Sequence, residues 1–328
     1  MLVLLLHSYF VEATDYSMAN YIQKFTGTSG LSGVAVPLFY FMSGILFFKS
    51  VNCTKDCITG IRKRIFSLLM PYIIWNIVFV GWYMFMSIIP GISGFVNSDL
   101  ISHFRLDRPF AGLEYLLLEP AGFHLWFMRD LIVYVVFSPL LWLLLKRFPW
   151  LTLIGFYMVF GGVPRCGITY FTLGGLVSSR FSLDYVSHVL NRSFVLVCSL
   201  LFLLNAVMAV IFGCAHITHN PYWQQLTNTV GIISMWGMYD IVNRNECPGK
   251  LSDILSFISK YSFFIYLFHE PVFNIIKKLS LILIGVHEWS LILLYLINPI
   301  IMCALALVVA KVFQNYMPRL YSVLVGGR

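Results

Sequence analysis

The run from Val34 to Lys49 constrains the fold of this chain more than any other feature. It reads VAVPLFYFMSGILFFK, is almost wholly apolar, and carries no charged side chain before Lys49. A helix at the surface of a soluble protein needs a polar face, and this run has none, so its expected surroundings are lipid. Pro37 and Gly44 are tolerated where neighbouring helices re-satisfy the backbone hydrogen bonds. We therefore predict a membrane-spanning helix here.

Composition extends this interpretation to the whole chain. Of its 328 residues 59% are hydrophobic and 11% are charged, whereas soluble domains carry about 25% charged residues. The net charge of +8 is typical of basic loops on one side of a membrane, so we expect membrane lipids as partners and no nucleic acid. The seven cysteines are scattered and predict no disulfide framework. Cys53 and Cys57 lack a second ligand pair, and we predict no metal.

Hydropathy predicts an all-α, polytopic transmembrane bundle. The length allows about ten spans of roughly 20 residues. We expect them at residues 1–10, 32–48, 65–89, 123–145, 150–163, 168–179, 193–213, 224–242, 261–276 and 285–313. No linker marks a second domain, so residues 1–328 are predicted to form one integral-membrane domain. Loop 90–122 is too long for a simple turn, and loops of that size are often functional.

The basic residues predict the orientation. Fifteen lie in one set of loops and ends: Lys49, Lys55, Arg62, Lys63, Arg64, Lys146, Arg147, Arg180, Arg192, Arg244, Lys250, Lys260, Lys311, Arg319 and Arg328. Six lie on the other side: Lys24, Arg105, Arg108, Arg165, Lys277 and Lys278. Because cytoplasmic loops are enriched in Lys and Arg, the first set and both termini are expected in the cytoplasm.

Three histidines fall within predicted spans: His7, His124 and His269. An imidazole suits general base catalysis because its pKa lies near the working pH. A histidine among apolar helices can equally be a structural hydrogen-bonding group. His7 could be interfacial, and a structural role is slightly favoured for His269, where Tyr266 could bond across helices.

Two groups of charged residues can likewise be either functional or structural. Trp126 and Arg129 share a helix face near His124 and could line an active cavity with Tyr266 and His269, yet Arg129 and Asp130 could simply neutralise each other. The cluster of Arg62, Lys63 and Arg64 is either a topology signal or a phosphate site, since guanidinium groups match phosphate oxygens. Coenzyme A would suit the second role.

Several catalytic signatures are missing from the sequence. There is no Walker loop, no G-x-S-x-G and no H-E-x-x-H motif. An ATP-driven pump, a membrane-embedded lipase and a zinc protease are therefore disfavoured.

Five stretches taken together resemble the acyltransferase 3 family of bacterial membrane sugar O-acyltransferases. They are VLLLHSYF, VAVPLFYFMSGILFF, RKRIFSLLMPYIIWN, FHLWFMRDLIV and ISKYSFFIYLFHEPV, in this order across residues 3 to 272. The resemblance implies about ten spans in the bacterial cytoplasmic membrane. It also implies transfer of an acyl group, mostly acetyl, from cytoplasmic acyl-CoA to a hydroxyl of a cell-envelope or exported glycan, which is free or lipid-linked. The alternatives are a glycan or small-solute transporter and an accessory subunit of polysaccharide export.

The resemblance also implies site residues. His7 matches the family's catalytic histidine, which would act as a base or briefly carry the acyl group. Arg62 and Arg64 correspond loosely to its donor-binding arginines, with Tyr72 and Trp75 along the path of the pantetheine arm. The family's first-span Arg would fall before Met1, and residues 1–10 are short for a span, so we expect an internal start or truncation, with roughly ten further residues completing the helix.

Overall fold

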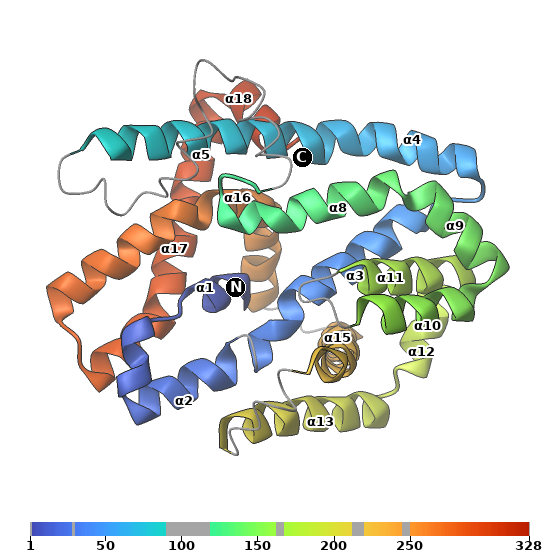
Figure 1. Cartoon of the computed structure of the whole chain (residues 1–328), viewed down its shortest axis with the longest axis horizontal. Coiled ribbons are helices and arrows are strands. Elements are labelled where there is room, and N and C mark those ends of the chain that lie inside the picture. Colours follow the sequence, from blue (N-terminus) through green and yellow to red (C-terminus); the bar gives the residue numbers. More distant parts are fainter. Residues whose placement is uncertain are drawn as a thin grey trace.

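All regular secondary structure is helical in the residues that the computed structural model describes, which are 2–27, 30–89, 119–161, 167–211, 220–244 and 250–327 (Figure 1). No strand occurs among them, as the all-α prediction requires. The first elements are α1 Leu2–His7, η1 Val11–Asp15, α2 Ser17–Thr26, η2 Leu31–Val34, α3 Ala35–Phe48, α4 Thr54–Arg64, η3 Ile65–Leu69 and α5 Met70–Ile88. The next are η5 Phe123–Leu125, α8 Trp126–Val136, α9 Ser138–Arg147, α10 Pro149–Phe160 and α11 Ile168–Arg180. The last are α12 Leu183–Val189, α13 Arg192–Ile211, α15 Pro221–Arg244, α16 Lys250–Ile284, α17 Glu288–Tyr316 and α18 Pro318–Leu324.

Every predicted span contains a helix, but these helices differ widely in length. Three helical stretches are long and apolar enough to cross a membrane: Ser17–Phe48, Thr54–Ile88 and Glu288–Tyr316. Helices α8 and α9 together make a fourth candidate. Helix α1 has only six residues. Within the described ranges the structure thus supports a helical protein with three or four candidate spans, and ten spans stays a prediction.

The predicted span 123–145 is two helices rather than one. Helices α8 and α9 are bent by 60° relative to each other, and Phe137 between them has a non-helical backbone. Pro139 in the first turn of α9 explains the break, because proline has no N–H to donate to the carbonyl of Val135, four residues earlier, so that α8 cannot continue through it. Most of the predicted loop 90–122 lies outside the described residues.

Large apolar side chains cover much of the outer surface. Ile88, Ile282 and Leu283 are each exposed by between 78% and 82%. Such a surface is costly in water and favourable in hydrocarbon. The outer faces of the helices are therefore consistent with lipid as their surroundings.

Helices α3 and α11 pack at very close range, and glycines make this contact possible. A Cβ atom added to Gly174 would lie 2.1 Å from the main-chain oxygen of Phe41, and one added to Gly44 would lie 2.1 Å from that of Phe171. Small residues at helix crossings let two backbones approach in this way. Gly44, which the sequence alone predicts only to be tolerated within a membrane helix, thus allows α3 to pack closely against α11.

We expect Gly174→Ala to destabilise the protein, because the new methyl group would force the α3 and α11 backbones apart. Overpacking of this kind costs about 1–3 kcal/mol. A thermal melt in detergent should show a lower midpoint. Gly155→Ala in α10 is the matched control, since no described atom lies within 4 Å of its added Cβ. Equal midpoints for the two variants would contradict the close packing.

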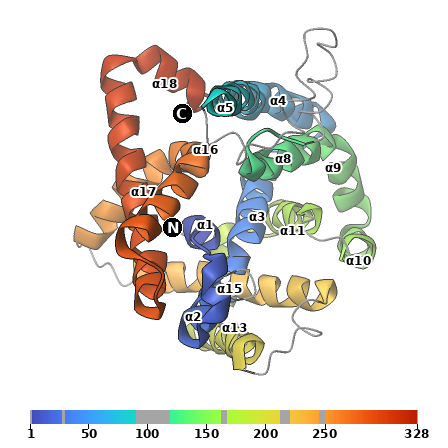
Figure 2. The ribbon, with the colours of Figure 1, turned by 60° about the vertical axis from the view of Figure 1, so that its left-hand side comes forward.

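Helix α1 lies in the middle of the bundle, where it packs against α3, α16 and α17 (Figures 1 and 2). Leu4 is buried in a cluster that includes Phe273 of α16 and Met302 of α17. Just after the helix, the Ser8 hydroxyl donates to the main-chain oxygen of Tyr295 at 2.8 Å. The end of α1 is therefore fixed in the interior.

Helices α5, α16 and α18 share an aromatic cluster. The Trp75 ring lies 6.1 Å from that of Phe264 and 5.6 Å from that of Phe79, between ring centroids. The indole N–H of Trp75 donates to the main-chain oxygen of Leu324 at 3.2 Å. This cluster holds α5 against α16.

Helix α16 is broken in its second half. Glu270 has extended backbone angles (φ −99°, ψ 140°), and Pro271 follows it. Proline lacks the N–H that would bond to the carbonyl four residues earlier, which belongs to Leu267. That carbonyl is therefore free to accept a hydrogen bond from outside the helix.

Candidate active site

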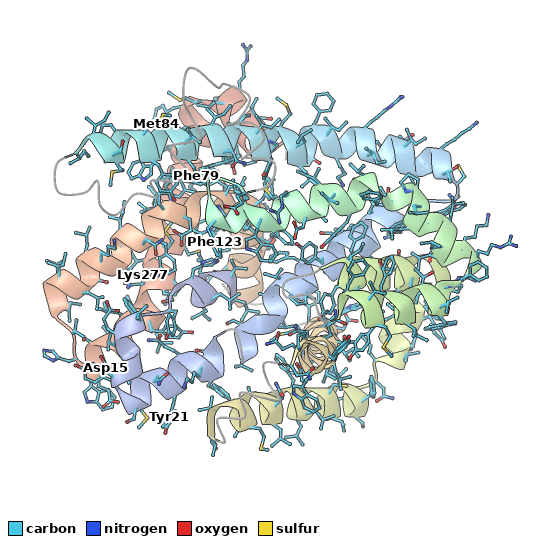
Figure 3. All side chains as sticks on the ribbon, viewed as in Figure 1. Asp15, Tyr21, Phe79, Met84, Phe123 and Lys277 are labelled. Carbon is cyan, nitrogen blue, oxygen red and sulfur yellow. The ribbon has the colours of Figure 1, made fainter. Side chains whose placement is uncertain are left out.

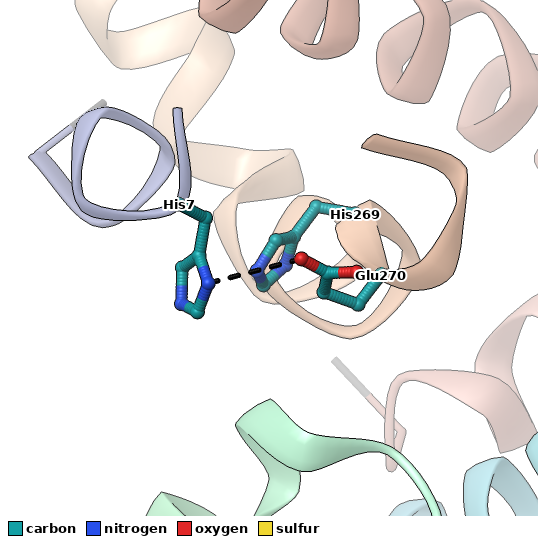
Figure 4. A group of neighbouring side chains, drawn as sticks. All are labelled: His7, His269 and Glu270. Atoms are coloured by element: carbon teal, nitrogen blue, oxygen red, sulfur yellow. Dashed lines mark ion pairs between the residues drawn. The ribbon is translucent and has the colours of Figure 1, made fainter. Parts of the chain in front are cut away.

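His7, the last residue of α1, faces a carboxylate from α16. Its Nδ1 atom lies 3.8 Å from Oε1 of Glu270, within ion-pair distance (Figure 4). The side chains are 22% and 11% exposed, respectively. The separation of the two atoms is too long for a hydrogen bond, so the carboxylate acts on the ring through its charge, which favours a protonated imidazole.

The three histidines that the sequence singled out lie in a row. The ring centroids of His7 and His269 are 5.0 Å apart, and those of His269 and His124 are 4.6 Å apart. They come from α1, α16 and η5, which are far apart in the chain. His124 and His269 are almost fully buried, so His7 is the most accessible of the three.

Main-chain carbonyls fix the tautomers of the two buried histidines. Nε2 of His124 lies 3.3 Å from the oxygen of Leu267, the carbonyl that Pro271 leaves free. Nδ1 of His269 lies 2.6 Å from the oxygen of Tyr266. A carbonyl only accepts, so these nitrogens carry the protons. His124 Nδ1 and His269 Nε2 remain as acceptors with no hydrogen-bond partner among the described residues.

Aromatic side chains surround the histidines. The Tyr266 hydroxyl donates to the main-chain oxygen of His124 at 2.7 Å, which places Tyr266 as a support for η5. Phe79 packs edge-on against His124 with centroids 5.4 Å apart, and Phe123 packs edge-on against His7 at 6.3 Å. Both are labelled in Figure 3. Phe79 is buried and shields His124 from water, whereas Phe123 is exposed beside His7.

Sequence reasoning did not select Glu270 and Lys277 as site residues. Oε2 of Glu270 accepts from the amide of Asn274 at 2.6 Å, which orients the carboxylate. Burial lowers the pKa of the Lys277 ammonium, and the Glu270 and Glu12 carboxylates oppose that shift. The available signal was a carboxylate within an apolar span, which is expensive and therefore often functional.

Arg129 forms an ion pair with its chain neighbour. Its Nε and Nη2 donate to Oδ1 of Asp130 at 2.9 and 2.7 Å. The two side chains thus neutralise each other, and a role for Arg129 in the active cavity stays a prediction. Trp126 packs edge-on against Phe127, with centroids 6.5 Å apart.

The predicted donor-binding arginines lie on the helix that leads to the histidines. Arg62 is exposed and Arg64 is half-buried, both near the end of α4. Helices α4, η3 and α5 are continuous, and Phe79 of α5 contacts His124. The 15 residues from Arg64 to Phe79 span about 22 Å at about 1.5 Å per residue. Tyr72 and Trp75 are buried along this path.

Three of these side chains could also hold a metal ion. One ligand atom each from His7, His269 and Glu270 lies within 4.8 Å of the other two. Two histidines and a carboxylate are a common ligand set for zinc. However, the Lys277 ammonium bonds to the carbonyl of His7 and would repel a cation. The charge of Lys277 therefore favours the His7–Glu270 pair acting without a metal.

Comparison with known proteins gives a family and one related polysaccharide protein. Residues 1–312 match the model of the acyltransferase 3 family, described as an acyltransferase domain. The succinoglycan biosynthesis protein ExoH of Rhizobium meliloti (strain 1021) is 24% identical over an alignment of 331 positions, which covers 96% of this chain and 84% of that protein. No solved structure matches this chain.

Proposed function

The chain belongs to the acyltransferase 3 family, and from this premise we propose that it transfers an acyl group, acetyl in our proposal, from cytoplasmic acyl-CoA to a hydroxyl of a cell-envelope or exported glycan. The observation that carries the proposal is the His7–Glu270 pair at the end of α1. The similarity to a succinoglycan biosynthesis protein supports a polysaccharide acceptor, free or lipid-linked. The apolar outer faces of the helices support a location within a membrane, and we propose that this is the bacterial cytoplasmic membrane.

In the proposed reaction His7 removes the proton of the acceptor hydroxyl. The oxygen then attacks the thioester carbonyl, the C–S bond breaks, and the CoA thiolate takes the proton from the imidazolium. Glu270 would stabilise that imidazolium through its negative charge. In a variant of this scheme His7 attacks the thioester first and carries the acyl group to the hydroxyl. Both schemes require the same histidine.

We assign Arg62 and Arg64 to the donor, because coenzyme A carries several phosphates that guanidinium groups match. The continuous helix from Arg64 to Phe79 supports a donor that lies along it with its thioester toward the histidines. Tyr72 and Trp75 would flank the pantetheine arm on this path.

Replacing Arg62 and Arg64 together with glutamine should raise the KM for acyl-CoA with little change in kcat. These charges are expected to hold the donor equally in the ground state and the transition state, and loss of such uniform binding appears in KM. Steady-state kinetics with varied acyl-CoA would measure it. Lys63→Gln, between them, is the control and should have a smaller effect. An unchanged KM for acyl-CoA in the double variant would show that these arginines do not bind the donor and serve only to orient the chain in the membrane.

Mass spectrometry of cell-envelope and exported glycans from a deletion strain tests the proposed function. Loss of acyl groups from one glycan, restored by the wild-type gene and not by His7→Ala, is the expected result. Unaltered glycan acylation in the deletion strain would reject the proposal.

A further inference from the structure

Lys277 connects the second half of α16 to the end of α1. Its Nζ donates to the main-chain oxygen of His7 at 2.7 Å and to that of Tyr9 at 3.4 Å. His7 ends α1, and the last carbonyls of a helix have no partner within the helix. A lysine near a helix C-terminus satisfies these carbonyls and interacts favourably with the helix dipole. Lys277 lies on α16 in Figure 3.

The same stretch of α16 also holds the side chain of His7. Glu270 faces the imidazole, and Asn274 donates to Glu270. Glu270 lies at the break of α16, and Asn274 and Lys277 lie in the first turns of the helix that follows it, three positions apart and therefore on one face. This stretch of α16, from the break at Glu270 to Lys277, therefore contacts both the side chain and the main chain of His7.

The lysine stem has its own support. Nζ of Lys277 lies 5.6 Å from the centroid of the Phe273 ring, within the range of a cation–π contact. Phe273 is fully buried in the cluster that contains Leu4 of α1. The ammonium is thus anchored beside the helix end that it bonds.

We propose that Lys277 is a positioning residue that holds the end of α1 so that His7 faces Glu270. The inference rests on the proposed function of His7 and adds a residue to that same site. Lys277 is not assigned a contact with either substrate. Its contribution comes through the backbone of His7, since a misplacement of about 1 Å at a reacting group can cost about 10²-fold in rate.

Lys277→Met keeps much of the stem and removes the donors. We expect kcat for acyl transfer to fall by about 10²-fold, with the KM for acyl-CoA unchanged because the donor arginines lie on another helix. Lys277→Arg should recover part of the loss, since it retains charged donors. The adjacent Lys278, which is exposed, provides the control: Lys278→Met should leave kcat unaltered. Wild-type kcat in Lys277→Met would overturn the proposal.

Amide hydrogen exchange gives a second test that needs no activity. Peptides covering residues 4–10 should exchange faster in Lys277→Met than in the wild type or Lys278→Met, while peptides from α5 stay the same. If the amide protons of residues 4–10 exchanged at the wild-type rate in Lys277→Met, the proposal that Lys277 holds the end of α1 would be rejected. If the wild-type protein transferred no acyl group, the proposed function would fail, whereas exchange would still decide whether Lys277 holds α1.

Discussion

Replacing His7 with alanine should lower glycan acylation by about 10² to 10⁴-fold, the usual contribution of a general base. The structure supports this expectation because His7 is the most accessible histidine of the row and lies beside Glu270. Acyl transfer by membranes containing equal amounts of each protein would measure the effect. Activity close to wild type would exclude His7 as the base and as an acyl carrier.

Two other histidines serve as controls for that experiment. His188 on α12 is exposed, and His188→Ala should retain full activity. His269→Ala should give a smaller loss than His7→Ala, because His269 is fully buried and one of its nitrogens already bonds a carbonyl of its own helix. A loss confined to His269→Ala would move the catalytic role to that residue.

Glu270→Gln should be the second most damaging change, with an expected loss in kcat of about 10² to 10³-fold, within the range that general base assistance contributes. Glutamine keeps the size of the side chain but removes the negative charge that would stabilise a protonated His7. Removal of a charge beside a catalytic histidine has a large effect because the imidazolium formed in the reaction loses its counter-charge. Single-turnover kinetics would show whether the chemical step is slowed.

The matched control for Glu270 is Glu288→Gln at the start of α17. Glu288 accepts from the main-chain N–H of Met18 on the exposed surface, away from the histidine row, so activity should be kept. Similar kinetics for Glu270→Gln and the wild type would show that the carboxylate does not assist His7.

The helical class could be predicted because it follows from local properties of the sequence. Apolar runs without a polar face specify helices in lipid, and each predicted span does contain a helix. The bend at Phe137 and the break at Glu270 were not predicted, although Pro139 and Pro271 signal both. Whether a proline ends a helix or only bends it depends on the helices packed against it. The hydropathy of one segment carries no information about those neighbours.

The histidines of the candidate site could be predicted from the sequence, but the side chains that contact them could not. His7, His124 and His269 stood out because ionisable groups within spans are rare and often functional. The pairing of His7 with Glu270 depends on how α1 packs against α16, a contact between the two ends of the chain. Lys277 counts among the loop charges in the sequence because it follows the predicted span 261–276. Its ammonium nevertheless donates to the carbonyl of His7, a contact that also depends on how α1 packs against α16.

The most direct test of the central claim follows both products of one reaction. Purified protein in lipid vesicles would be supplied with acetyl-CoA labelled in the acetyl group and with the envelope glycan fraction of its own host. CoA thiol release and label in the glycan would be recorded together. Our account predicts equal amounts of both products, dependent on the glycan and lost in His7→Ala. Thiol release without glycan labelling, or labelling that survives in His7→Ala, would contradict it.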